Sequence, residues 1–124
     1  MMNPQAILVI DDDQAIREML RQTLNAAGYR ATTVASGREG GHLLKHELFA
    51  LVIIDIFMPG RDGLEMIVEI SKRHPGLPIV AISGGGSLTP EKSLEIARFM
   101  GARAVLPKPF TSEQLLSAIK TLLP

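Results

Sequence analysis

The chain has no cysteine at any of its 124 positions. Disulfide bonds, thiolate nucleophiles and sulfur-ligated metal sites are therefore all excluded. A bound metal ion would have to be held by other ligands, and oxygen ligands suit hard cations. Carboxylates, hydroxyls and amines are thus the functional groups with which this sequence can work.

Net charge is also absent, since 13 Lys and Arg side chains balance 13 Asp and Glu side chains. A balanced chain lacks the basic footprint of a nucleic-acid-binding protein, and it has no polybasic segment for a membrane surface. The longest apolar run is too short to span a bilayer, and residues 1–6 do not resemble a signal peptide. The sequence therefore predicts a cytoplasmic protein without nucleic-acid or membrane partners.

Repeats, low-complexity tracts and linkers are missing as well. Hydrophobic residues make up 46% of the chain and charged residues 21%, an ordinary composition for a soluble protein with a substantial core. We therefore expect a single domain over residues 1–124, with no output segment after Leu123.

Short apolar runs alternate five times with segments of helical periodicity. The runs predict strands at Ile7–Ile10, Arg30–Ala35, Leu51–Asp55, Pro78–Ile82 and Arg103–Leu106. The other segments predict helices that end near Gly28, Glu47, His74, Gly101 and Leu122. The second strand is rich in Thr and Ala, which favours a sheet edge. This alternation is typical of an α/β fold with a parallel sheet, right-handed crossovers and helices on both faces.

Helix-capping residues stand at the expected helix starts. The candidates are Asp13 for the first helix, a Ser36–Glu39 capping box, Thr89 before Pro90, and a Thr111–Gln114 capping box. The second helix is interrupted by Gly40 and Gly41, each of which costs about 1 kcal/mol relative to alanine in a helix interior. We expect this helix to be among the less stable elements.

Polar side chains follow four of the predicted strands. Asp11 and Asp12 follow the first strand, Asp55 ends the third, Ser83 follows the fourth and Lys108 follows the fifth. Because the carboxyl ends of parallel strands meet at one edge of the sheet, we expect these side chains to converge. In the doubly wound order the first and third strands are neighbours, which would bring the acids together.

Three converging carboxylates need a cation. Two unit charges roughly 4 Å apart repel by about 4 kcal/mol at an effective dielectric constant near 20. An all-oxygen ligand set suits Mg²⁺, which fills its remaining positions with water and phosphate oxygens. A metal ion, a hydroxyl and an ammonium group around one carboxylate indicate phosphoryl transfer. Asp55 is the expected nucleophile because it alone ends the central strand.

The sequence resembles a response-regulator receiver domain from Ile7 to Leu123. The matching motifs are ILVIDDD, LVIIDIFMPGRDG, PIVAISG and PKPF. The resemblance implies a doubly wound (βα)5 flavodoxin-like three-layer sandwich with the parallel strand order 2-1-3-4-5. It also implies a phosphorylation-dependent signalling switch of a bacterial two-component or phosphorelay system, rather than an enzyme.

The same resemblance implies a role for each site residue. Asp55 resembles the phosphoacceptor, Asp12 a direct ligand of Mg²⁺ or Mn²⁺, and Asp11 an acid that acts largely through water. The backbone carbonyl of Phe57 would be a further metal ligand. Ser83 resembles the switch hydroxyl, and Lys108 the lysine that pairs with the phosphoryl group, followed by a cis bond to Pro109.

The partners implied by the resemblance are proteins. A histidine kinase or a histidine phosphotransfer protein would supply the phosphoryl group, and a downstream protein would read the surface of the fourth helix, fifth strand and fifth helix. The domain would be a monomer or a phosphorylation-dependent dimer.

Three residues depart from the usual receiver pattern. Val105 stands where receivers usually carry a rotating aromatic side chain, so the coupling of hydroxyl movement to an aromatic flip is not expected in its usual form. Phe57 and Gly85 occupy positions that flank the attacking water in this family. Neither side chain can orient that water, so we expect slow autodephosphorylation.

Other functions are open to the same residues. The Asp11-x-Asp13 spacing resembles the nucleophile motif of haloacid-dehalogenase-like phosphatases, but that reading leaves Asp55 without a role. We expect Asp13 to serve the helix N-terminus instead. A flavin carrier shares the architecture, but the three acids would repel a flavin phosphate. A receiver that only docks partners, without taking phosphate, is a third reading.

The three histidines lack acidic or cysteine partners at ligand spacing. We expect His42, His46 and His74 to be surface residues without metal-binding or phosphotransfer roles.

Overall fold

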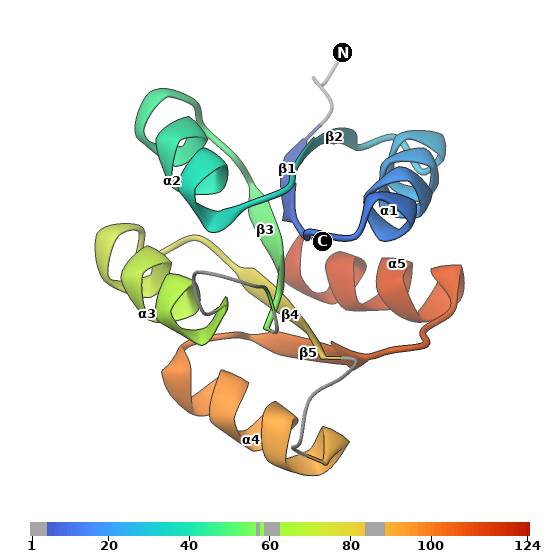
Figure 1. The fold of residues 1–124 in the computed structure, drawn as a ribbon. Coiled ribbons are helices and arrows are strands. Elements are labelled where there is room, and N and C mark those ends of the chain that lie inside the picture. The colour runs from blue at the N-terminus through green and yellow to red at the C-terminus, as the bar shows by residue number, and fades with distance from the viewer. Residues whose placement is uncertain (1–4, 57, 59–62, 84–88) are drawn as a thin grey trace.

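The computed structural model describes residues 5–56, 58, 63–83 and 89–124 of the chain. Five strands and five helices alternate (Figure 1). They are β1 (Ala6–Ile10), α1 (Gln14–Ala26), β2 (Arg30–Val34), α2 (Gly37–His46), β3 (Leu51–Asp55), α3 (Gly63–Arg73), β4 (Ile79–Ser83), α4 (Pro90–Met100), β5 (Ala104–Pro107) and α5 (Ser112–Leu122). The predicted alternation is confirmed, and the strand bounds agree within one residue.

The five strands form one parallel sheet in the order β2-β1-β3-β4-β5. The doubly wound order implied by the resemblance is therefore confirmed. Every residue of β1, β3 and β4 is buried, as continuous apolar runs predict for inner strands. The Thr-rich β2 lies at one edge and is only partly buried, also as predicted.

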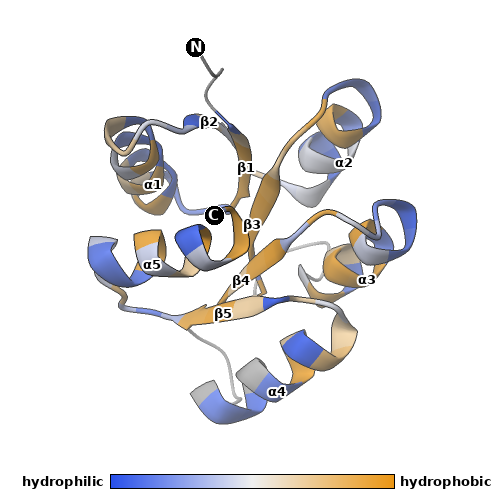
Figure 2. Ribbon diagram, turned by 180° about the vertical axis from the view of Figure 1, so that it is seen from behind, coloured by the Kyte–Doolittle hydropathy of each residue, from blue (hydrophilic) through white to orange (hydrophobic). Residues whose placement is uncertain are grey.

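The sheet separates two hydrophobic cores, because successive side chains of a strand point to opposite faces. On one face Ile7, Val9 and Ile53 pack with Leu20 and Leu24 of α1 and with the buried side chains of α5. On the other face the alternate strand residues pack against α2, α3 and α4. Figure 2 shows the same arrangement, with hydrophobic strands between helices whose outer surfaces are hydrophilic.

Capping groups begin four of the helices. The carboxylate of Asp13 accepts hydrogen bonds from the backbone N–H groups of Ala15 and Ile16, and Thr89 caps α4. The Thr111–Gln114 capping box is complete. At α2 the Ser36 hydroxyl accepts from the Glu39 N–H and donates to the Glu39 carboxylate at 3.3 Å. The second helix is thus capped by a side-chain pair that differs from the predicted box.

Gly40 of α2 has a packing role that the sequence analysis did not predict. A Cβ atom at this position would collide with the Cδ1 atom of Ile10 and would lie 2.9 Å from its Cγ1 atom. The missing side chain lets α2 pack closely on the end of β1, so Gly40 contributes to packing. Helix propensity does not include a contact from another element, and the low stability expected for α2 stays a prediction.

Candidate metal and phosphoryl-acceptor site

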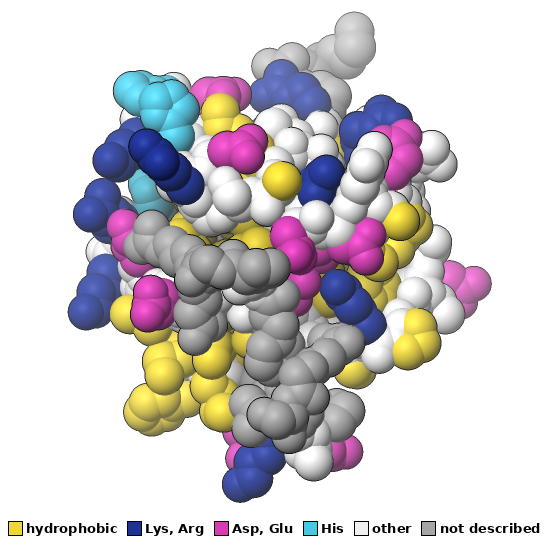
Figure 3. Space-filling model, viewed as in Figure 1, with side chains coloured by type: hydrophobic (Ala, Val, Ile, Leu, Met, Phe, Trp, Pro, Cys, Tyr) yellow, Lys and Arg dark blue, Asp and Glu magenta, His cyan; other side chains and the backbone are white. Residues whose placement is uncertain are grey.

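Three acids meet at the carboxyl ends of β1 and β3. Ile10 pairs with Ile54 in the parallel ladder, so Asp11 and Asp55 follow at the same level. Carboxylate oxygens of Asp11, Asp12 and Asp55 lie within 4.8 Å of one another. Asp11 and Asp55 are buried, whereas Asp12 is exposed. Figure 3 shows Asp and Glu side chains gathered near the centre of the face in view. The predicted convergence of the acids is confirmed.

Asp11 is the most deeply buried of the three acids and is held from several sides. Its Oδ1 atom accepts a hydrogen bond from the Asp13 N–H at 2.9 Å, and its backbone carbonyl accepts one from the Arg17 guanidinium at 2.9 Å. Its Oδ2 atom is buried without a hydrogen bond in the described part of the chain. This oxygen faces the Lys108 ammonium group, with which it forms an ion pair.

Lys108 supplies the ammonium group of the site. It follows β5, and its Nζ atom lies 3.4 Å from Asp55 Oδ2 and 3.5 Å from Asp11 Oδ2. The Lys108 N–H donates to the Ser83 carbonyl at 2.7 Å, which ties the two chain segments together. The bond from Lys108 to Pro109 is cis, as the resemblance implied.

Burial and charge change the pKa values of two of these groups. Burial raises the pKa of the Asp11 carboxyl, although the Asp13 N–H and Lys108 oppose this change. Burial alone would lower the pKa of Lys108, but the charges of Asp55 and Asp11 outweigh it and raise the value. The site thus favours a protonated Lys108, while a negative charge on Asp11 carries a desolvation cost.

Ser83 is the last residue of β4 and is buried beside this edge of the sheet. Its position in the ladder follows Ile82, which pairs with Asp55, so the two residues end neighbouring strands. Phe57 and Gly85, which entered the sequence analysis as a metal-ligand and a water-flanking position, lie outside the described residues. Val105 is partly buried in β5 and packs against the core shared with α2, α3 and α4.

Comparisons with known proteins agree with this geometry. Residues 7–120 match the family model described as "Response regulator receiver domain". The chain belongs to this family. The resemblance found in the motifs is thereby confirmed, and the haloacid-dehalogenase and flavin-carrier readings gain no support.

Among curated relatives, the response regulator MprA of Mycolicibacterium vanbaalenii is 37% identical to this receiver domain over 120 residues. That alignment covers 97% of the chain and 51% of the relative, so the chain spans about half the length of the curated relatives it matches. The match thus covers nearly all of this chain but only about half of a longer regulator.

Solved structures give the same result for the fold. A CheY-like receiver domain protein from Methanospirillum hungatei is 33% identical, with a TM-score of 0.88 over 97% of this chain and 94% of that one. The chemotaxis protein CheY4 of Vibrio cholerae is 30% identical, with a TM-score of 0.85 over 96% of this chain and 98% of that one. These two structures therefore share the fold that brings the three acids together here.

The donor set of this receiver domain fits a hard divalent cation. All three side chains offer carboxylate oxygens, and the ammonium group of Lys108 balances only part of their charge. Asp13 does not join this group, because its carboxylate caps α1. The prediction of a helix-capping role for Asp13 is confirmed.

Two residues that support the site were missed by the sequence analysis. Arg17 lies one turn into α1 and binds the Asp11 carbonyl. Gly63 begins α3, and a Cβ atom there would collide with the Asp55 carbonyl and lie 2.6 Å from the Ile56 carbonyl. The glycine in the RDG sequence was visible, but only the folded chain shows which backbone it contacts.

Across the described ranges, this receiver domain has no helix long and apolar enough to cross a membrane.

Proposed function

We propose that this receiver domain accepts a phosphoryl group on Asp55 in a Mg²⁺-dependent reaction. The observation that carries the proposal is the convergence of Asp11, Asp12 and Lys108 on the end of the central strand. A histidine kinase or a histidine phosphotransfer protein would be the donor. The family assignment supports a partner of this kind.

The three acids would hold the Mg²⁺ or Mn²⁺ ion, with Asp12 as the accessible ligand and Asp11 as the buried one. The backbone carbonyl of Phe57, outside the described residues, would be a further ligand by resemblance. When bound, the ion neutralises the carboxylates and offsets the negative charge of the incoming phosphate.

Asp55 would act as the nucleophile. One of its carboxylate oxygens forms a bond to phosphorus while the bond from phosphorus to the imidazole nitrogen of the donor breaks, and the electron pair returns to that imidazole. Lys108 already lies 3.4 Å from Asp55 Oδ2, so its ammonium group can pair with a phosphoryl oxygen on the same carboxylate. The Ser83 hydroxyl would donate to another phosphoryl oxygen.

Phosphorylation would then change a protein-binding surface. We propose a signalling switch that phosphorylates itself from a donor and dephosphorylates slowly, with output through a downstream protein. The oligomeric form would be a monomer or a phosphorylation-dependent dimer. The receiver family supports a switch of this kind.

The test is incubation with acetyl phosphate and Mg²⁺, followed by mass spectrometry of the intact protein. The wild-type protein should gain one phosphoryl group, and Asp55→Asn should gain none. Asp12→Asn should need much more Mg²⁺ for the same extent of reaction. Asp13→Asn is the matched control, because asparagine also caps helices well, and it should react like the wild type.

One outcome would favour the phosphatase reading instead. If p-nitrophenyl phosphate were hydrolysed by Asp55→Asn but not by Asp11→Asn, the nucleophile would be Asp11 and the proposal would be wrong.

A further inference from the structure

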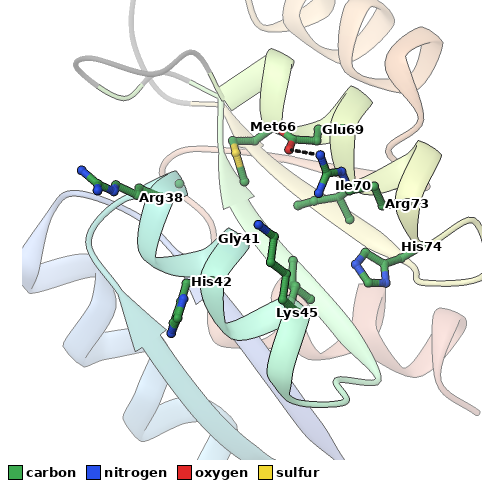
Figure 4. Close-up of a pocket in the computed structure, with 11 residues that line it drawn as sticks. Arg38, Gly41, His42, Lys45, Met66, Glu69, Ile70, Arg73 and His74 are labelled. Atoms are coloured by element: carbon green, nitrogen blue, oxygen red, sulfur yellow. Dashed lines mark ion pairs between the residues drawn. The ribbon is translucent and has the colours of Figure 1, made fainter.

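A groove separates α2 from α3, on the sheet face opposite α1 and α5. It encloses a cavity of about 280 Å³. Its floor includes the buried side chains of Leu44, Met66 and Ile70. Figure 4 shows Lys45 on α2 and the Glu69–Arg73 pair on α3 at its two sides, with Met66 reaching from α3 toward α2.

Two glycines one helical turn apart shape the α2 side of this groove. A Cβ atom at Gly37 would lie 2.9 Å from the side chain of Met66, so at this end the helices touch. A Cβ atom at Gly41 would have no described atom within 4 Å. The groove is therefore closed near Gly37 and open over Gly41.

Gly41 has no packing explanation within the described residues. Its backbone is helical, it has no positive φ angle, and no neighbour limits a side chain there. A glycine in a helix interior costs about 1 kcal/mol relative to alanine. Gly40, its neighbour, differs because Ile10 occupies the space that a side chain would take. The space beside Gly41 is thus open. No contact among the described residues requires a glycine there, although the glycine lowers the stability of the helix.

The rim of the groove is positively charged. Lys45 on α2 and Arg73 on α3 line it, and Glu69 is the acid that lines it among the described residues. Arg38 also belongs to the lining, but Figure 4 shows its side chain pointing away from α3. Glu69 lies 3.5 Å from Arg73 and holds that guanidinium beside the opening. Figure 3 shows Lys, Arg and His side chains along the left edge of the molecule, where α2 and α3 lie. With Lys45 and Arg73 set against Glu69, the opening of the groove carries a small excess of positive charge.

We propose that the groove binds a small organic anion that carries one phosphate or carboxylate group on a flat apolar body. The cations at the rim would hold the anionic group, and the apolar floor would cover the body. The cavity volume is near the lower end of the range for small-molecule sites, which suits a mononucleotide-sized ligand. The site is separate from the acidic edge, which would repel an anion.

The test is a titration of the protein with AMP, without added divalent metal, followed by amide NMR chemical shifts. We expect saturable shifts in α2 and α3. Adenosine and inorganic phosphate, added alone, should each bind at least about tenfold more weakly, because each lacks one of the two groups.

Two variants separate binding from folding. Gly41→Leu fills the open space and should abolish AMP binding while the melting temperature stays the same or rises. Lys45→Gln should raise the Kd for AMP about tenfold, the size expected for a lost charge-assisted contact. Lys120→Gln is the matched control, since Lys120 is an exposed lysine in the last turn of α5.

Several results would overturn the proposal. Absence of saturable shifts in α2 and α3, unchanged AMP binding by Gly41→Leu, or equal loss in Lys45→Gln and Lys120→Gln would each do so. Equal affinity for phosphate and AMP would also overturn it, because the apolar floor would then have no part. Phosphorylation of Asp55 by acetyl phosphate should be unchanged in Gly41→Leu, so this site and the proposed phosphoacceptor can fail independently.

Discussion

The interior of the sheet and its carboxyl edge differ in how completely their groups are satisfied. In the interior, apolar strand residues are covered on both faces, and the parallel ladder pairs the backbone. At the edge the buried polar side chains of the described residues gather, namely Asp11, Asp55 and Ser83. The interior needs nothing from outside the chain. The edge is left with three carboxylates against the one ammonium group of Lys108, so it is the part that depends on a ligand.

Removing a large interior side chain should have the largest effect on stability. Ile53 is fully buried in β3, so Ile53→Ala removes packed methylene groups and leaves a cavity. We expect a loss of about 4 kcal/mol in the free energy of unfolding, measured by urea denaturation. Thr32→Ala in the edge strand, where burial is partial, is the control and should cost less than about 1 kcal/mol. Equal losses of stability in the two variants would contradict the view that the interior of the sheet is more tightly packed than its edge strand.

The next effect concerns the junction between interior and edge. Gly63→Ala would force a Cβ atom into the carbonyls of Asp55 and Ile56, which are backbone groups that cannot rotate away. We expect a loss of about 3 kcal/mol in the free energy of unfolding. Gly76→Ala is the matched control, because a Cβ atom at Gly76 would meet no described atom within 4 Å. If Gly63→Ala were as stable as Gly76→Ala, the start of α3 would have room for a side chain beside the carbonyls of Asp55 and Ile56.

Magnesium should stabilise the edge without affecting the interior. Binding to the folded protein alone raises the free energy of unfolding by about 2.7 kcal/mol at a Mg²⁺ concentration roughly 100 times the Kd. The measurement is the melting temperature as a function of MgCl₂ concentration. Asp12→Asn should lose most of the rise, whereas Ile53→Ala, although less stable, should keep it. A rise of equal size in Asp12→Asn would place the bound ion elsewhere.

The smallest change in the free energy of unfolding should come from Asp11→Asn in the absence of metal. This variant should gain stability, whereas a core mutation loses it. The pKa of Asp11 is raised by burial above its ordinary value of 3.8, so the folded state binds the proton more tightly than the unfolded state. The wild-type protein therefore loses stability from this group as the pH rises from 3.8 through the raised pKa.

Asp11→Asn removes this loss and should be more stable than the wild type at neutral pH. Urea denaturation in EDTA at several pH values from roughly 4 to 7 measures the difference. Asp13→Asn serves as the control, since that carboxylate caps a helix at the surface. A variant that is less stable than the wild type throughout this range would mean that the attraction between Asp11 and Lys108 exceeds the cost of burial.

The sequence was sufficient for the features that depend on pattern. Continuous apolar runs identified β1, β3 and β4, and the Thr-rich run identified β2 as an edge strand. Because parallel strands end at one edge, the positions of Asp11 and Asp55 after two strands placed both acids at that edge. Their meeting also required the first and third strands to be neighbours. The order of the strands and the cis bond before Pro109 came from the family resemblance, since no local pattern specifies them.

The features that escaped the sequence are contacts between distant residues. Gly40 and Gly41 look alike in the chain, yet one packs against Ile10 and the other faces open space. The bond from Arg17 to the Asp11 carbonyl depends on the angle at which α1 leaves β1. Propensity and periodicity describe each element by itself, so they do not contain such distances.

The contact at Gly63 has a mechanical consequence. Side chains can usually absorb a small movement by changing rotamer, but here the main chain at the start of α3 rests directly on the carbonyl groups of Asp55 and Ile56. A displacement of the end of β3 would therefore displace the start of α3 as well. Helix α3, which forms one wall of the groove between α2 and α3, is thus in direct backbone contact with Asp55.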